Sequence, residues 1–327
     1  MKTVAFFNHK GGVGKTTLVY NVGLALAREG KTVLFIDADA QANLTGAAIS
    51  MEKLEEIIDQ EETIFGALEP VLQGRGDFVK KNVVKIRENA YILPGDIRLS
   101  SFEEVLPQAW TECLAGAFRG FQITTAVYRM VQKLGAEVDA DYAFIDLGPN
   151  VGALNRAIMI GADGFVVPLS PDLFSLTALP SVGKSVAAWT MDWEAALQSA
   201  ERRGTAIDAG APKGKPSPVG YVNQQFASYR GVPTAAFQRW SKRIPLAYDQ
   251  ELVAPLREAG IPIPDGPALL GEVRNLSSLI PMAQHSNVAV FELAGTQARG
   301  AQFTRAKDTY GLFAKIAAGI EKRLSVD

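Results

Sequence analysis

The sequence predicts a doubly wound α/β fold, a mostly parallel sheet with helices on both faces. Short apolar runs are nearly continuous, which is typical of strands buried on both faces. These runs alternate with helical patterns, as in parallel sheets whose crossovers are helices. Several of the runs also end in a polar or acidic residue. The runs occupy residues 3–8, 32–37, 90–94, 142–146, 164–168 and 218–223.

The helical segments follow the strands in order. A glycine-rich loop after the first strand leads into a helix over residues 15–29, which Gly30 ends. Residues 51–74 and 95–140 have the patterns of helices and excursions on the same domain. We therefore predict a single domain over residues 1–327, with longer helical excursions near 190–215 and 226–271.

Composition argues against a fold that depends on disulfides or a structural metal, and against a membrane-spanning protein. The 327 residues are 47% apolar and 21% charged, enough to bury a core without disulfide or metal support. Cys113 is the one cysteine, so no disulfide forms within the chain and no cluster that needs two cysteines per subunit can be held. No apolar run approaches the roughly 18 residues of a membrane span. We expect a cytoplasmic protein.

The loop after the first strand has the residues of a phosphate-binding loop. Glycines let backbone N–H groups close around phosphate oxygens, while a lysine supplies charge and a hydroxyl binds Mg²⁺. Lys15 and Thr16 fill the last two roles, at the start of a helix whose amino end favours anions. We expect ATP and Mg²⁺ as cofactors. The loop residues expected to contact nucleotide are Gly11, Gly12, Val13, Gly14, Lys15, Thr16 and Thr17.

Three acids fall at the carboxyl ends of predicted strands, the edge at which ligands bind in open α/β sheets. Asp37 and Asp39 follow one strand, and Asp146 ends another. Phosphoryl transfer needs acids to hold the metal and to orient the attacking water. These acids would complete a nucleotide site.

The loop resembles the deviant Walker A motif, K-G-G-x-G-K-[ST]-[ST], of the ParA/MinD family of P-loop ATPases. The segment that begins at Asp37 is similar to the family's D-x-D-P-Q-x-N motif, although Ala40 and Ala42 replace the usual Pro and Gly. A second segment, which contains Asp146 and ends at Pro149, is similar to the family's hhhhD-x-x-P motif. The resemblance covers most of the chain and is weakest in the two excursions.

The resemblance implies a role for each matching residue. Lys10 would reach the nucleotide of a partner subunit across a dimer interface, making it catalytic together with Lys15 and Asp39. Asp39 would position the hydrolytic water. Thr16, Asp37 and Asp146 would hold or support Mg²⁺. Asn223, at the end of the strand 218–223, would contact adenine.

The implied function is that of a ParA-like ATPase. ATP would drive formation of a homodimer that binds DNA nonspecifically and associates with the nucleoid. A ParB-like or other adaptor protein would stimulate slow hydrolysis. Such a cycle serves plasmid or chromosome partition or the positioning of another cargo.

A cationic tract is the candidate DNA surface, although net charge is −2. Residues 209–248 contain six basic residues and no acid, with aromatic residues among them. Such a tract can neutralise phosphates without reading sequence, but it also fits an ordinary solvated helix face. The predicted DNA contacts are Arg230, Arg239, Lys242, Arg243 and Arg274.

Two other functions stay open at this point. A MinD-like protein would bind a membrane through the last helix, where apolar residues such as Phe313, Ile316 and Ile320 recur at helical spacing beside lysines. We favour core packing for that stripe and expect no membrane partner. The other alternative is a regulatory or defence ATPase that acts through protein contacts without DNA.

Overall fold

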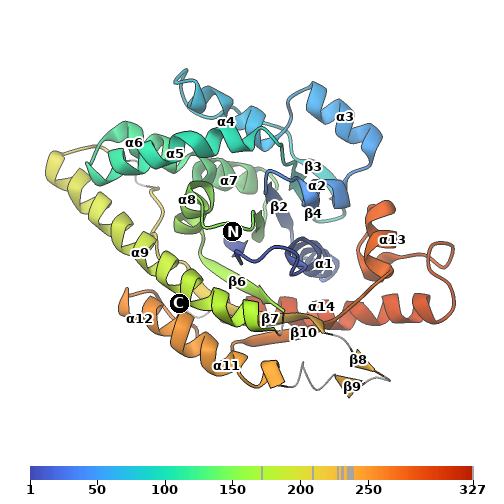
Figure 1. The fold of residues 1–327 in the computed structure, drawn as a ribbon. Helices are drawn as coiled ribbons and strands as arrows, with labels where there is room; N and C mark the ends of the chain where they lie inside the picture. Colours follow the sequence, from blue (N-terminus) through green and yellow to red (C-terminus); the bar gives the residue numbers. More distant parts are fainter. Residues whose placement is uncertain (171, 208–209, 227, 230–231, 234–238, 326–327) are drawn as a thin grey trace.

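Eight strands form one sheet in the order β10-β7-β6-β1-β5-β2-β4-β3 (Figure 1). The computed structural model describes the chain apart from residues 171, 208–209, 227, 230–231, 234–238 and 326–327. Neighbouring strands are parallel except β3 and β4, which are antiparallel. The strands are β1 Lys2–Phe6, β2 Val33–Ala38, β3 Val84–Arg87, β4 Ala90–Leu93, β5 Tyr142–Leu147, β6 Gly164–Leu169, β7 Ser217–Phe226 and β10 Leu269–Arg274.

Helices cover both faces of this sheet, and each face has its own hydrophobic core (Figure 1). The predicted doubly wound α/β fold is therefore confirmed. One face carries α4 Ile64–Leu72, α5 Leu99–Leu114, α6 Phe118–Thr124, α7 Ala126–Glu137, α8 Ala153–Gly161, α9 Leu173–Arg203, α11 Ile244–Ala247, η1 Tyr248–Val253 and α12 Ala254–Glu258. The other carries α1 Lys15–Arg28, α2 Asn43–Ala48, α3 Met51–Asp59, α13 Leu279–His285, η2 Val290–Glu292 and α14 Ala301–Leu324.

The central strands explain why their sequence runs are continuously apolar. Every residue of β2, β5 and β6 is buried, because helices pack on both sides. Helix α1 packs closely on β2, where a Cβ on Gly23 would lie 2.3 Å from the Phe35 ring. A glycine at this position lets the helix that begins in the phosphate loop lie directly on the sheet.

The prediction of a helical excursion over residues 226–271 is partly wrong. Residues 226–271 include helical α11, η1 and α12, but strand β10 begins at Leu269 and joins the sheet beside β7. Short strands β8 Ser228–Tyr229 and β9 Val232–Pro233 also lie in that range. Only Leu270 and Val273 of β10 are buried, so this edge strand lacks the continuous apolar run of a central one. The other predicted excursion, near residues 190–215, begins with the last turns of α9. That helix ends at Arg203, and the next residue, Gly204, has a left-handed backbone conformation. One domain over 1–327 stays a prediction.

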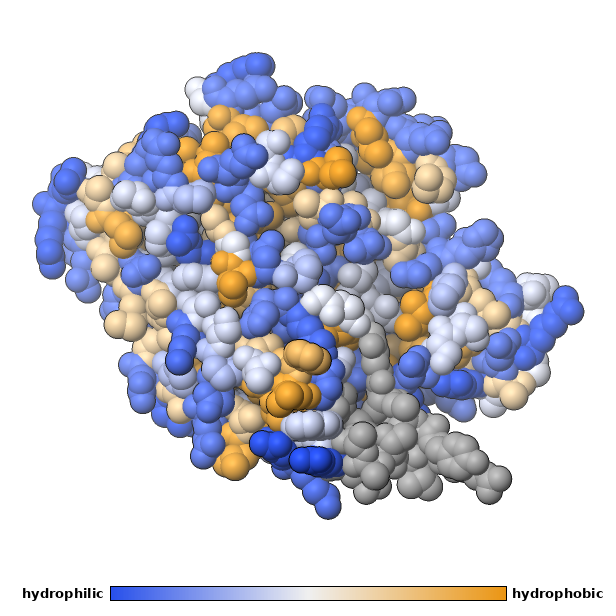
Figure 2. Space-filling view, viewed as in Figure 1, coloured by the Kyte–Doolittle hydropathy of each residue, from blue (hydrophilic) through white to orange (hydrophobic). Residues whose placement is uncertain are grey.

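The last helix, α14, packs its apolar stripe into the core. Phe313, Ile316 and Ile320 are fully buried, as the core-packing interpretation requires. No helix within the described ranges is long and apolar enough to cross a bilayer. Figure 2 shows hydrophobic side chains on the viewed face in small separate groups among hydrophilic ones.

Candidate functional site

The loop between β1 and α1 has the backbone that a phosphate cradle requires. Gly12 and Gly14 have φ angles of 72° and 81°, a region that residues with a Cβ rarely adopt. Gly14 precedes the first residue of α1, so the amino end of that helix faces the loop. The side-chain amide of Asn8 donates to the carbonyl of Pro168 at 2.7 Å and accepts from the Lys10 N–H at 3.0 Å, which ties the loop to β6.

The structure brings Lys15, Thr16 and Asp146 into contact. Lys15 Nζ lies 2.7 Å from Asp146 Oδ1, and Thr16 Oγ1 donates to Asp146 Oδ2 at 2.6 Å. Asp146 is completely buried and the Lys15 side chain is 8% exposed. Burial raises the pKa of Asp146 above its ordinary value, although Lys15 opposes that rise. Lys15 and Asp146 thus form a buried ion pair. A bound phosphate and a metal ion could separate the two side chains and become their partners.

Asp37 lies beside Asp146 because β2 and β5 are adjacent and place the two residues in register. Its Oδ2 accepts from both the N–H and the hydroxyl of Thr45 at 2.7 Å. Full burial, and then the charge of Asp146, raise the pKa of Asp37 to about 7. Gly95 closes the other side, where an added Cβ would lie 2.8 Å from Asp37 Cγ. No sequence motif identified Thr45 as a partner of Asp37. Gly95 could have been found, because it follows the end of a predicted strand.

Asp39 stands at the same edge and faces the turn after β5. Its Oδ1 accepts from the Gln41 N–H at 3.0 Å, and a Cβ on Gly148 would lie 3.7 Å from that oxygen. Asp39 is 7% exposed. Its charge adds to the rise in the pKa of Asp146 that burial causes, whereas the contacts with Lys15 and Thr16 oppose that rise.

The donor set fits a magnesium nucleotide. No three Asp, Glu, His or Cys side chains in the described part of the chain gather closely enough to bind a metal alone. Mg²⁺ is commonly held by one or two carboxylates together with substrate phosphates. Thr16, Asp37 and Asp146 could supply the protein's share next to the loop.

Asn223 is buried at the same edge of the sheet, but it is not the last residue of its strand. Strand β7 continues to Phe226, three residues beyond the predicted end. Asn223 Nδ2 donates to Glu272 Oε1 at 3.3 Å, while its Oδ1 is buried without a partner among the described residues. An orphaned amide oxygen suits the amino group of a base.

Lys10 contacts its own chain here. Its ammonium group forms an ion pair with Asp172 and lies 5.7 Å from the centroid of the Phe174 ring. Asp172 caps α9 by accepting from the Ser175 N–H at 2.8 Å. Partial burial opposes ionisation of Asp172, but the hydrogen bonds from Lys10 and Ser175 outweigh it and lower the pKa of that carboxyl. The sequence motifs gave no sign of this pairing.

The predicted DNA contacts are dispersed. Arg230 lies outside the described residues. Arg239 and Arg243 are exposed and lie over the Trp240 ring, with guanidinium carbons 5.4 and 5.1 Å from its centroid. Lys242 is exposed beside them, and Arg274 is exposed at the carboxyl end of β10.

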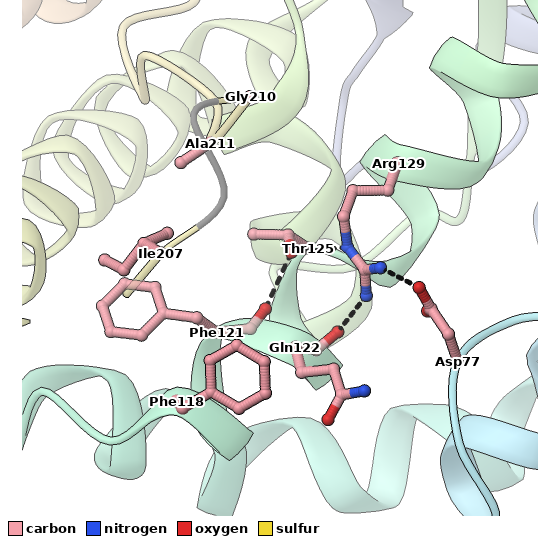
Figure 3. A pocket seen from close by; sticks show the side chains of 9 residues that line it. All are labelled: Asp77, Phe118, Phe121, Gln122, Thr125, Arg129, Ile207, Gly210 and Ala211. Atoms are coloured by element: carbon pink, nitrogen blue, oxygen red, sulfur yellow. Dashed lines mark hydrogen bonds and ion pairs between the residues drawn. The ribbon is translucent and has the colours of Figure 1, made fainter. Parts of the chain in front are cut away.

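A separate hollow near α6 and α7 has no comparable chemistry (Figure 3). It encloses about 90 Å³, with Phe118 and Phe121 on one side and Gly210 and Ala211 on the other. Arg129 spans its rim, donating to the Gln122 carbonyl at 2.8 Å and pairing with Asp77. The two charged residues of its lining, Arg129 and Asp77, pair with each other.

Ala42 has an unfavourable backbone at the turn after Asp39. Its φ and ψ angles are 49° and 36°, the left-handed region that glycine occupies at lower cost. This alanine stands where the resembled motif has glycine. The strained turn leads directly into α2, which carries Thr45.

We expect Ala42→Gly to raise the free energy of unfolding by about 0.5–1 kcal/mol, because glycine removes the left-handed penalty. Urea unfolding monitored by circular dichroism measures the change. Ala47→Gly, inside α2, is the matched control and should destabilise the protein by about 1 kcal/mol. Equal destabilisation by both variants would contradict the strained-turn explanation.

Comparisons with known proteins show what this chain resembles in sequence and fold. A family model described as an AAA domain matches residues 1–198. The chromosome partitioning protein ParA of Caulobacter vibrioides is 32% identical over 187 residues, and the match covers 57% of this chain and 62% of that protein. The chain thus spans less than two thirds of this relative's length.

Two solved structures are similar over nearly the whole chain. The Cyanothece McdA(D38A)–ATP complex superposes with a TM-score of 0.62 at 18% identity, covering all of this chain and 97% of that one. The structure of pNOB8 ParA bound to nonspecific DNA gives 0.60 at 19% identity, covering 100% and 99% of the two chains. At these identities the structures establish a shared fold.

Proposed function

Because the chain belongs to the ParA/MinD family of P-loop ATPases, we propose that it is an ATP-driven switch that dimerises around Mg-ATP and binds DNA nonspecifically. The observation that carries the proposal is the cluster of Lys15, Thr16 and Asp146 at the mouth of the glycine loop, with Asp37 alongside. Nucleotide phosphates would take the Lys15 ammonium from Asp146. Mg²⁺ would supply charge neutralisation between the phosphates and the carboxylates.

The surroundings of the loop support dimerisation. Several large apolar side chains are exposed on the segments that follow this carboxyl edge, where a partner subunit could cover them. Two begin α9 beside Lys10, one follows Pro149, and one follows Gly95. They are Leu173, Phe174, Val151 and Ile97, with exposed fractions of 51%, 70%, 44% and 72%. A second subunit placed against this edge would cover them and bring its own Lys10 to the first subunit's nucleotide.

The exposed cations support DNA as the ligand of the dimer. Arg239, Lys242 and Arg243 precede α11 without a nearby acid in sequence. Pairing two subunits would double this positive charge and hold the two copies at a fixed spacing. Binding through phosphates follows from charge alone and needs no base contact. Hydrolysis stimulated by a ParB-like or other adaptor protein would then release the dimer.

The test compares the wild type with Lys10→Ala. We expect Mg-ATP to convert the wild type to dimers in light scattering and to strengthen binding to a random-sequence duplex at least tenfold. Raising salt from about 50 to 200 mM should weaken that binding at least tenfold, since phosphate contacts release counterions. Lys10→Ala should stay monomeric and bind DNA weakly with ATP present.

Lys53→Ala, an exposed lysine on α3, is the control and should behave as the wild type. Equal DNA affinity with and without ATP would refute the switch. Dimerisation without DNA binding in any nucleotide state would instead favour a regulatory ATPase that acts through protein contacts.

A further inference from the structure

A second cavity lies at the opposite edge of the sheet from the phosphate loop. The loop follows the carboxyl end of β1, whereas the cavity opens beside Leu269, the first residue of β10, and the two strands point the same way. Its volume is about 660 Å³, within the range of small-molecule sites. Apolar walls come from Tyr221, Val253 and Ile263, together with prolines of the loop before β10.

Tyr248 leaves a polar group without a partner in the wall of this cavity. Its side chain is 2% exposed, and its ring packs on Tyr221 with centroids 4.9 Å apart. The hydroxyl oxygen has almost no accessible surface and no hydrogen bond to any described residue, so a ligand in the cavity would reach it through a small local shift. Burial raises the pKa of Tyr248 above its ordinary value, so the hydroxyl keeps its proton and is a donor. An unsatisfied buried hydroxyl is costly, and a ligand acceptor would remove that cost.

The same residue begins a π-helical turn. η1 runs over Tyr248–Val253, and π-helical turns are rare and frequent at functional sites. This turn places Tyr248 and Val253 in the cavity wall and Asp249 at its rim. It also packs against α9, where a Cβ on Gly183 would lie 2.3 Å from the Glu251 carbonyl oxygen. The turn is therefore held firmly in place.

Arg323 adds a buried positive charge. It is 6% exposed and donates to the carbonyls of Pro264, Asp265, Gly266 and Pro267 at 2.7–3.2 Å, and to that of Val219. These contacts hold the loop before β10 in place but bring no negative charge. Within the described part of the chain no carboxylate lies in ion-pair distance of Arg323, although buried charges are usually paired.

The rim carries both signs of charge. Arg257 is exposed there and forms no ion pair with a described residue. Asp249 and Asp265 are exposed on the rim, and the charge of Asp265 acts on Arg323 from there. Solvent screens the two carboxylates more than it screens the buried guanidinium. The interior of the cavity therefore favours an anion.

We propose that this cavity is a second binding site, which takes a small free carboxylate with an apolar body. The carboxylate would accept from the Tyr248 hydroxyl and lie near the guanidinium groups of Arg323 and Arg257. The apolar body would fill the space between Tyr221, Val253 and Ile263. The site does not depend on the nucleotide site or on the function proposed above.

Octanoate is the test ligand, measured on the full chain by displacement of the fluorescent probe anilinonaphthalene sulfonate. We expect one equivalent of probe to bind saturably below about 1 mM and to be displaced by octanoate. Octanol, of equal length and without charge, should displace it at least tenfold less well. Mg-ATP should not displace it.

Tyr248→Phe isolates the hydroxyl. Octanoate binding should weaken at least about tenfold, because a hydrogen bond to a charged group is lost. The melting temperature should stay equal or rise, since the hydroxyl has no partner to lose. Arg257→Gln, at an exposed position, should also weaken octanoate. Tyr128→Phe, on α7, is the matched control and should leave binding unchanged.

Several outcomes would overturn the proposal. They are absence of saturable probe binding, displacement by octanol as strong as by octanoate, displacement by Mg-ATP, or wild-type octanoate affinity in Tyr248→Phe.

Discussion

Asp39→Ala should bind Mg-ATP with nearly wild-type affinity and hydrolyse it about 10²–10⁴ times more slowly. The reason is the position of Asp39 at the carboxyl end of β2, facing Gly148 and separate from the Lys15–Asp146 pair. Its carboxylate can orient the attacking water but makes no contact with the loop that binds phosphate. Removing it should slow the chemical step and leave a long-lived ATP dimer.

Phosphate release in single turnovers measures hydrolysis, and a fluorescent ATP analogue measures affinity. Lys15→Ala is the contrasting variant, because it removes the charge at the phosphates and should abolish nucleotide binding itself. Wild-type hydrolysis by Asp39→Ala would show that the water-positioning role belongs to another residue. Loss of binding in both variants would place Asp39 in the nucleotide contact.

Asp37→Asn should be more stable than the wild type above pH 7 in the absence of nucleotide, by up to about 4 kcal/mol. Burial raises the pKa of Asp37 from 3.8 to about 7, so the folded protein keeps a proton that the unfolded chain loses. Between pH 4 and pH 7 the unfolded state therefore binds fewer protons, and wild-type stability falls as pH rises. Asparagine keeps the acceptor for Thr45 and does not ionise.

Urea unfolding of both proteins at about pH 4.5, 6 and 8 measures the effect, because the carboxyl groups away from the Asp37–Asp146 pair titrate alike in the two. The stability difference should grow with pH and level off above pH 7. A difference that is constant over this range would mean that Asp37 is ionised in the folded protein.

The predictable part of the site is the part that chain order determines. Lys15 and Thr16 open the helix after β1, and Asp146 ends a neighbouring strand. Parallel strands bring their carboxyl ends to one edge, so the three side chains meet within 2.6–2.7 Å. The alternation of apolar runs and helices likewise predicted the central strands.

The remaining contacts depend on tertiary packing. Thr45 contacts Asp37 because the chain turns at Ala42, in a left-handed conformation, before α2 begins. No sequence motif predicted that turn. Lys10 meets Asp172 across 162 residues, which requires β6 to lie beside β1. Strand β10 was missed because an edge strand buries few side chains, so its sequence does not differ enough from a loop or helix.

Helix α9 gives the ion pair of Lys10 a mechanical consequence. It is 31 residues long, or about 46 Å, and begins at the residue after Asp172. Its far end lies beside the turn between α5 and α6, where the Thr205 hydroxyl donates to the Gly116 carbonyl at 2.7 Å. Pro180 removes a backbone hydrogen bond near the start of α9, and helices commonly bend at such a residue. Release of Lys10 toward a partner's nucleotide, as proposed above, would thus free a hinge between Asp172 and Pro180 while the far end of α9 stays attached.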